Sequence, residues 1–274
     1  MSEPKEIYSH TSALHDIHVI DHGFVRTLSF GPTHQSSMFL DAPFDTDFEY
    51  PGYFHLALAV KPDSVRALAV GLGGGTVVKR MWRDYPEMRV DAVELDAQVV
   101  DVARRFFELP ADERVRVFVD DGRHFLEMCP DTYDIVIVDA FEGDAVPPQL
   151  SDAGFMAALH ARLAPDGAVV YNFVGTPEGD GAEPLRALHA TLAEAWRRVW
   201  VFEINEGISA DGSTNLILLA TDSPVSDDEL QARIASRVDG RVTVPAFQLF
   251  GEGHELSGGQ GDPLVDIARH QVDV

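Results

Sequence analysis

The chain has 274 residues, 45% of them hydrophobic, and a formal net charge of −24. This length and apolar content predict one sizeable globular domain with a smaller extension, while the negative charge argues against nucleic acid or an anionic membrane as a partner. A single cysteine, Cys129, excludes an intramolecular disulfide, and a polar N-terminus with no apolar run of roughly 20 residues leads us to expect a cytoplasmic protein without a membrane span.

Short β-rich stretches occupy the first part of the chain, at residues 16–20, 24–30 and 35–40. Gly, Pro and Asp separate them, as is typical of a small antiparallel sheet or hairpin. We therefore predict an N-terminal β-rich subdomain over residues 1–62.

Strand-like and helix-like segments then alternate. Helical spacing of apolar residues appears at 97–109, 152–163, 183–196 and 226–238, and "LAPDG" at 163–167 is typical of a helix end and a turn. Seven runs rich in Val, Ile or Leu are predicted strands: residues 65–71, 89–95, 114–121, 133–140, 167–174, 199–204 and 213–221.

This alternation predicts an α/β fold: a doubly wound, Rossmann-like, mostly parallel seven-stranded sheet, with the last two strands as a reversed hairpin. We assign it residues 63–250. The glycine-rich, polar residues 251–274 are expected to form a flexible C-terminal tail.

The first strand of this sheet runs into a glycine turn, "VGLGGGTVV", and then a helix. The spacing of Gly71, Gly73 and Gly75 is similar to a dinucleotide-binding turn, although Thr76 stands where Gly or Ala would let the helix approach closely. The glycines alone also fit a tight turn with no ligand.

Acidic residues follow the next three strands. Glu94 ends the second strand, Asp120 and Asp121 end the third, and Asp139 ends the fourth. Because ligands of open parallel sheets bind at the carboxyl ends of the strands, these side chains predict a site for a nucleoside that carries a cationic centre. A nicotinamide enzyme would need only the glycines and Glu94.

Five segments, taken in order, resemble the spermidine synthase-like family of S-adenosylmethionine-dependent transferases, whose fold is of the class I methyltransferase type. They are "VGLGGGTVVKRM", "VDAVELDAQVVDVARRFF", "VRVFVDDGRHFL", "YDIVIVDAFEGDAVPPQLSDAGF" and "LAPDGAVVYNF". The resemblance covers roughly residues 17–175.

The resemblance implies roles for individual residues. Glu94 would bind the ribose, and Asp121 the adenine amino group. The glycines of the turn, Gly71, Gly73 and Gly75, would let the backbone approach the nucleoside, which is S-adenosylmethionine or its decarboxylated form. Gln35 resembles the family glutamine that contacts this ligand, and Tyr53 the tyrosine that lines the acceptor site.

Asp139 resembles the family aspartate that accepts a proton from the acceptor amine. An amine with a pKa of about 10.4 is protonated at neutral pH and cannot attack. A carboxylate in reach accepts the proton, and it offsets the repulsion between ammonium and sulfonium by roughly 4 kcal/mol at 4 Å and an effective dielectric of 20.

The chain departs from the family pattern at three places. Gly74 stands where spermidine synthases have an Asp that holds the aminopropyl amine; Glu142 replaces a second Asp; and Phe54 and His55 follow Tyr53 in place of a polar residue and Glu. Three functions therefore stay open: aminopropyl transfer to an amine, methyl transfer from S-adenosylmethionine to a small molecule, and nucleoside binding without chemistry.

The sequence favours a small-molecule acceptor, such as a polyamine, as the partner. The eleven histidines are not at tight ligand spacing, so no metal is expected. A homo-dimer or tetramer is implied by the family resemblance alone.

Overall fold

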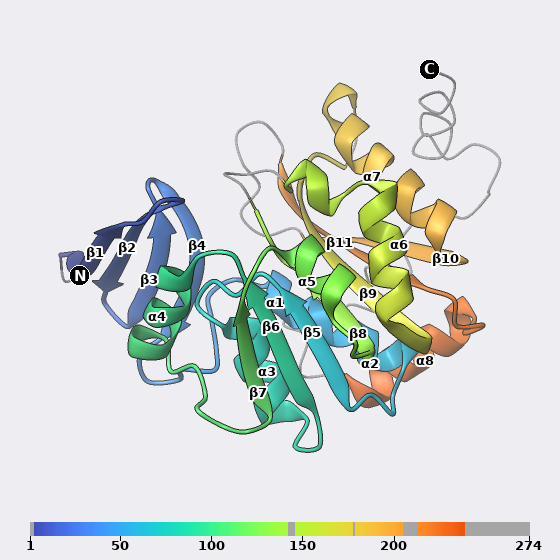
Figure 1. The fold of residues 1–274 in the computed structure, drawn as a ribbon, viewed down its shortest axis with the longest axis horizontal. Coiled ribbons are helices and arrows are strands. Elements are labelled where there is room, and N and C mark those ends of the chain that lie inside the picture. The colour runs from blue at the N-terminus through green and yellow to red at the C-terminus, as the bar shows by residue number, and fades with distance from the viewer. Residues whose placement is uncertain (1–2, 142–145, 178, 205–212, 239–274) are drawn as a thin grey trace.

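The computed structural model describes residues 3–141, 146–177, 179–204 and 213–238. Its N-terminal part is a four-stranded antiparallel sheet in the order β1 (Lys5–Thr11), β2 (Asp16–His22), β3 (Val25–Phe30) and β4 (Thr33–Phe39). The structure confirms that the N-terminal part is a small antiparallel β-sheet, as predicted from the sequence, and adds β1 as a strand that was not predicted. In Figure 1 this blue sheet stands at one end of the molecule.

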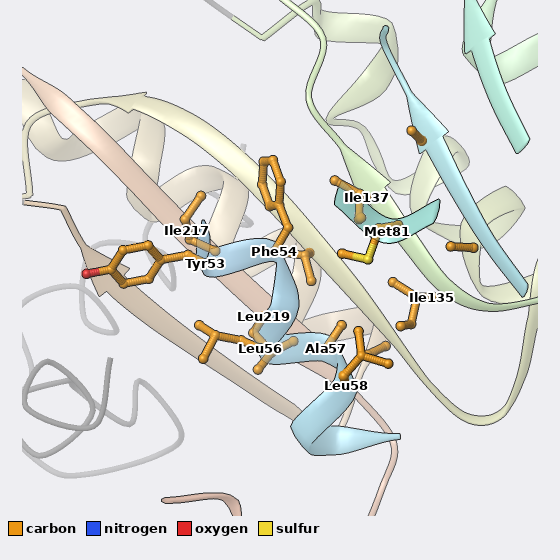
Figure 2. Close-up of a cluster of buried hydrophobic side chains, with 14 of the residues drawn as sticks. Tyr53, Phe54, Leu56, Ala57, Leu58, Met81, Ile135, Ile137, Ile217 and Leu219 are labelled. Carbon is orange, nitrogen blue, oxygen red and sulfur yellow. The ribbon is translucent and has the colours of Figure 1, made fainter. Parts of the chain in front are cut away.

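Residues 50–60 are helical, not β-rich: α1 (Tyr50–Tyr53), a 3-10 turn η1 (Phe54–Leu56) and α2 (Ala57–Val60) follow one another. Their apolar side chains lie in the core beside the larger sheet, where Figure 2 draws Phe54 and Leu56 among Ile217, Leu219 and Ile135. The segment therefore packs with the larger domain, although we predicted it as part of the N-terminal subdomain.

The larger sheet has seven strands in the order β10-β11-β9-β8-β5-β6-β7. β5, β6, β7, β8 and β9 run parallel, while β11 is antiparallel to both β9 and β10, so the predicted fold and its reversed hairpin are confirmed. Their bounds are β5 (Arg66–Val70), β6 (Arg89–Glu94), β7 (Val115–Val119), β8 (Tyr133–Val138), β9 (Leu163–Gly175), β10 (Arg198–Glu203) and β11 (Thr214–Thr221).

Helices connect most of these strands, and α8 follows the last of them. The predicted helices are found as α3 (Thr76–Asp84), α4 (Ala97–Phe106), α6 (Ala153–Arg162), α7 (Glu183–Ala195) and α8 (Asp227–Arg237), and the structure adds α5 (Gly122–Met128), η2 (Pro148–Leu150) and η3 (Asp180–Ala182). The turn expected at 163–167 is present, since Asp166 has a positive φ there. It lies within β9 because Leu163, before the turn, already pairs with Tyr133.

Both faces of the large sheet are covered, as a doubly wound fold requires. Apolar residues of α3, α4, α8 and the 53–60 segment form the core on one face, and those of α5, α6 and α7 form the core on the other. A third cluster joins the N-terminal sheet to α4, with Ile17 and Leu28 packed near Val99 and Phe107. In Figure 1, α4 correspondingly lies between the two sheets.

Within the described ranges, no helix is long and apolar enough to cross a membrane. The predicted tail, residues 251–274, lies outside the described residues.

Candidate active site

A cleft of about 960 Å³, its open mouth included, lies at the carboxyl ends of β5, β6, β7 and β8. Strands β3 and β4 of the N-terminal sheet supply the opposite side through Phe30, Gln35 and Ser36. Parallel strands bring their carboxyl ends to one edge, so residues distant in sequence meet there. Six residues predicted for the site line this cleft: Gln35, Gly71, Gly73, Glu94, Asp121 and Asp139.

The glycine turn after β5 is shaped by a close approach of two backbones. Gly71 has φ +96°, and a Cβ built on it would lie 2.1 Å from the carbonyl oxygen of Asp139. Gly73 also has a positive φ, +53°, but a Cβ there would meet only the side chain of Ser36, with Oγ at 3.6 Å and Cβ at 3.8 Å, which is ordinary contact. Gly71 is therefore required by both conformation and space, and Gly73 by conformation alone.

Glu94, at the end of β6, is 9% exposed. Its carboxylate lines the cleft and is also hydrogen-bonded to the glycine turn after β5. One carboxylate oxygen accepts a hydrogen bond from the backbone N–H of Leu72 and the other from that of Asp96, each at 3.0 Å. Burial raises the pKa of Glu94, and these backbone donors oppose the rise because they favour the charged form. The carboxylate retains lone pairs for a ligand hydroxyl.

Asp120 and Asp121 follow β7 and both line the cleft. Asp121 caps α5, since its Oδ1 accepts a hydrogen bond from the backbone N–H of His124 at 2.9 Å. Oδ1 of Asp120 lies 2.9 Å from Nδ1 of His124, and this hydrogen bond raises the pKa of that histidine. Asp121 is thus held at the cleft by a local cap, with further acceptor capacity for an amino group.

Asp139, directly after β8, is held by two neighbours. Asn172 Nδ2, near the carboxyl end of β9, donates to Asp139 Oδ1 at 2.9 Å, and the hydroxyl of Tyr50 forms a second hydrogen bond. Burial raises the pKa of Asp139 to about 6, while both hydrogen bonds act in the opposite direction. The pKa of Tyr50 lies well above its ordinary value because of burial and the charge of Asp139, so its hydroxyl stays a donor.

Two predicted site residues, Tyr53 and Gly75, do not line this cleft. Tyr53 is fully buried in the core, where Figure 2 shows it beside Ile217, and Tyr50, at the other end of α1, lines the cleft in its place. Gly75 caps the N-terminus of α3 with φ +74° and packs near Leu109. Glu142 lies outside the described residues.

A second pocket of about 460 Å³, mouth included, adjoins the cleft and shares Gln35, Tyr50 and Phe141 with it. Asn172 also lines this pocket; it is 1% exposed, and its Oδ1 has no hydrogen-bond partner among the described residues. Because Nδ2 already donates to Asp139, Oδ1 is left as an acceptor for a group in the pocket.

Comparison with known proteins identifies the family. The model of the spermine/spermidine synthase domain matches residues 53–173. A polyamine aminopropyltransferase of Streptococcus pneumoniae serotype 4 is 32% identical over 202 residues, which cover 70% of this chain and 67% of the relative. The chain belongs to the spermine/spermidine synthase family.

The match to other curated members of this family is partial. A probable polyamine aminopropyl transferase of Bifidobacterium longum is 31% identical over 190 residues, covering 68% of this chain and 41% of the relative. The chain spans 41–60% of the length of this and two further curated relatives. The crystal structure of a probable spermidine synthase from Corynebacterium glutamicum has a TM-score of 0.72 at 22% identity, over 83% of this chain and 86% of that one, and is evidence for the fold.

The departure from the family pattern at Gly74 has a structural counterpart. A Cβ at Gly74 would lie 2.9 Å from Ser36 Oγ and 2.9 Å from a ring carbon of Phe107, so these side chains occupy the space of a larger residue. Ser36 Oγ is 3.5 Å from Thr76 Oγ1, and both hydroxyl residues line the cleft and are buried. This corner of the cleft therefore carries hydroxyls at the N-terminus of α3.

Sequence reasoning missed Tyr50, Asn172, Ser36 and His15, all of which line the cleft or the second pocket. Asn172 gave the clearest signal, since it is a single amide inside the apolar run "AVVYNFV" of a buried strand. Over the ranges that the structure describes, no group of three His, Cys, Asp or Glu side chains gathers as a metal-binding cluster.

Proposed function

We propose that this protein transfers an aminopropyl group from decarboxylated S-adenosylmethionine to an amine. The observation that carries this proposal is Asp139, a carboxylate that lines the larger cleft and is hydrogen-bonded to Tyr50 and Asn172, two residues of the second pocket. Its pKa of about 6 leaves it mostly ionised at neutral pH. Membership of a family whose curated relatives are named polyamine aminopropyltransferases supports the same assignment.

The nucleoside would occupy the larger cleft. Gly71 and Gly73 leave room for its tail, the carboxylate of Glu94 accepts hydrogen bonds from ribose hydroxyls, and Asp121 accepts one from the adenine amino group. Gln35 faces both pockets and is suited to contact the donor near its sulfur. A spermidine synthase with the same fold, at 14% identity, has been crystallised in complex with the transition-state analogue AdoDATO.

The acceptor amine would occupy the second pocket. Its N–H donates to Oδ1 of Asn172, and the rings of Phe48, Tyr50 and Phe141 suit a cationic or apolar chain. Asp139 takes the amine proton, so that the nitrogen lone pair attacks the aminopropyl carbon bonded to sulfur. The C–N bond forms as the C–S bond breaks, and its electron pair neutralises the sulfonium to give 5′-methylthioadenosine.

The test is incubation of the purified protein with decarboxylated S-adenosylmethionine and putrescine, followed by mass spectrometry. We expect an aminopropylated amine and 5′-methylthioadenosine in equal amounts. Binding of 5′-methylthioadenosine by calorimetry without any product from a panel of amines would contradict aminopropyl transfer and favour a nucleoside-binding protein without chemistry.

Methyl transfer from S-adenosylmethionine is the second candidate, and the corner at Gly74 favours it. The methionine tail ends in a carboxylate, and the hydroxyls of Ser36 and Thr76 at the N-terminus of α3 are donors suited to an anion. The same assay with S-adenosylmethionine distinguishes the two reactions, since the product then gains a methyl group. The oligomeric state and the cytoplasmic location stay predictions.

A further inference from the structure

The second pocket contains no carboxylate among its described lining residues. Asp139 is hydrogen-bonded to Tyr50 and Asn172 of this pocket and can pair with the reacting ammonium of an acceptor. A second ammonium farther along the same ligand would meet only neutral side chains and His34, which is neutral or cationic. Removing a cation from water without an anionic partner costs more than a cation–π contact with a ring such as Phe48 gains. The pocket therefore suits an acceptor whose far end is uncharged.

A third pocket, of about 860 Å³ with its mouth included, meets the second at Val174, which lines both. It lies between the carboxyl end of β9 and α7, where Phe173 and Leu188 contribute to its apolar wall. Its only described side-chain polar groups are the hydroxyls of Ser151 and Thr191, and each already donates to a backbone carbonyl three or four residues earlier. The third pocket is therefore suited to an apolar group.

The end of β9 leads from one pocket to the other. Asn172 and Val174 are two residues apart on this strand, roughly 7 Å, and their side chains lie on the same face of the sheet. Asn215 of β11 pairs directly with Val174, and all three residues line the second pocket. Gly175, the last residue of β9, lines the third pocket. A chain of about six carbons that starts at Asn172 is long enough to pass Val174 and enter the third pocket.

We propose that the acceptor is a primary amine with a single cationic nitrogen and an apolar chain that runs past Val174 into the third pocket. This inference rests on the proposed function and names the acceptor class of the same site. The reaction is unchanged: the amine nitrogen bonds to the aminopropyl carbon as the C–S bond breaks, and its proton goes to Asp139. The products are an N-aminopropyl alkylamine and 5′-methylthioadenosine, and a diamine such as putrescine is a slow acceptor.

Steady-state kinetics with decarboxylated S-adenosylmethionine and a series of amines test this acceptor class in the wild-type protein. Pentylamine has a methyl group in place of the second ammonium of putrescine, so this pair isolates the effect of the charge. We expect kcat/KM for pentylamine to exceed that for putrescine by about tenfold or more. From pentylamine to hexylamine and heptylamine, kcat/KM should rise about threefold for each added methylene, as burial of apolar surface predicts.

Two variants change the pockets separately. Asn215→Asp adds a carboxylate at constant volume opposite Val174, and should raise the ratio of kcat/KM for putrescine to that for pentylamine about tenfold. Gln231→Glu, on α8, adds the same charge outside both pockets and is its control. Ala187→Phe fills the third pocket from α7 and should abolish the rise with chain length. Ala190→Phe is its control, because Ala190 lies on the same helix but does not line the pocket.

A higher kcat/KM for putrescine than for pentylamine would overturn the proposal, whichever carboxylate then binds the second ammonium. Equal values along the alkylamine series would also overturn it, since the chain would then not enter an apolar pocket. Product from none of the amines, with 5′-methylthioadenosine binding intact, would reject aminopropyl transfer itself. Failure of the acceptor class is thus distinguished from failure of the proposed function, because only the former still yields an aminopropylated product.

Discussion

The two halves of the site are built in different ways. The nucleoside half uses short loops after the neighbouring strands β5, β6 and β7, and its key groups are Gly71, Glu94 and Asp121. The acceptor half combines Tyr50 from α1, Asp139 from the loop directly after β8, and Asn172 from β9. In the nucleoside half, the conformation of the backbone shapes the site. The acceptor half depends on side chains from separate elements that meet only in the folded chain.

We therefore expect the nucleoside half to tolerate few changes of backbone conformation and the acceptor half to tolerate few changes of side chain.

The largest expected effect is on catalysis. Asp139→Asn removes the proton acceptor at nearly constant volume, so we expect kcat to fall by about 10³-fold, or about 4 kcal/mol in activation free energy, with 5′-methylthioadenosine affinity nearly unchanged. Product formation and calorimetry measure the two quantities.

Asp166→Asn is the control for this change, since Asp166 is exposed in the turn within β9 and its positive φ suits Asn. Turnover of Asp139→Asn at the wild-type rate would mean that another group accepts the proton.

Gly71→Ala tests whether the nucleoside half depends on the conformation of its backbone. The added Cβ would meet the carbonyl of Asp139 at 2.1 Å, and φ is +96°, so we expect the free energy of unfolding to fall by about 3 kcal/mol or more. Gly23→Ala shares the positive φ but has nothing within 4 Å of its Cβ, and should cost about 1 kcal/mol. Urea unfolding measures both; equal losses would show that the close approach contributes nothing.

Asn172→Leu tests whether the acceptor half depends on this amide. The change removes the donor to Asp139 and the buried acceptor in the second pocket, so kcat/KM for the amine should fall about 30-fold, roughly 2 kcal/mol. The pH dependence of the remaining activity should also change. Asp139 acts as the carboxylate, so activity is lost as pH falls through its pKa of about 6; without the Asn172 hydrogen bond this pKa rises, and the acid limb moves to higher pH.

Asn215→Leu changes the same pocket without contact to Asp139, and the acid limb should stay in place. An unshifted limb in Asn172→Leu would mean that Asn172 does not tune Asp139.

The smallest expected effect distinguishes two tyrosines of one short helix. Tyr50→Phe removes one hydrogen bond to Asp139 and should lower kcat/KM about fivefold, roughly 1 kcal/mol. Tyr53→Phe changes the core and should leave kcat/KM at the wild-type value. The reverse result in steady-state kinetics would restore Tyr53, the residue that the family resemblance implied.

Much of the fold follows from the sequence by itself. Apolar runs of strand length alternate with helical spacing, and this pattern predicted all seven strands of the large sheet. The same logic predicted that Glu94, Asp121 and Asp139 meet, because residues that follow parallel strands lie at one edge whatever the details of packing. The glycine turn was also readable, since Gly71 is needed by the backbone itself.

Tertiary structure alone decided which side chains complete the site. Tyr50 and Tyr53 are both aromatic residues of one helical segment, and only the packing of that segment against the large sheet turns Tyr53 into the core and Tyr50 toward Asp139. His15 and Asn172 join the site because separate elements converge there. Local sequence pattern encodes which face of an element is apolar, but not which distant residue that face will meet.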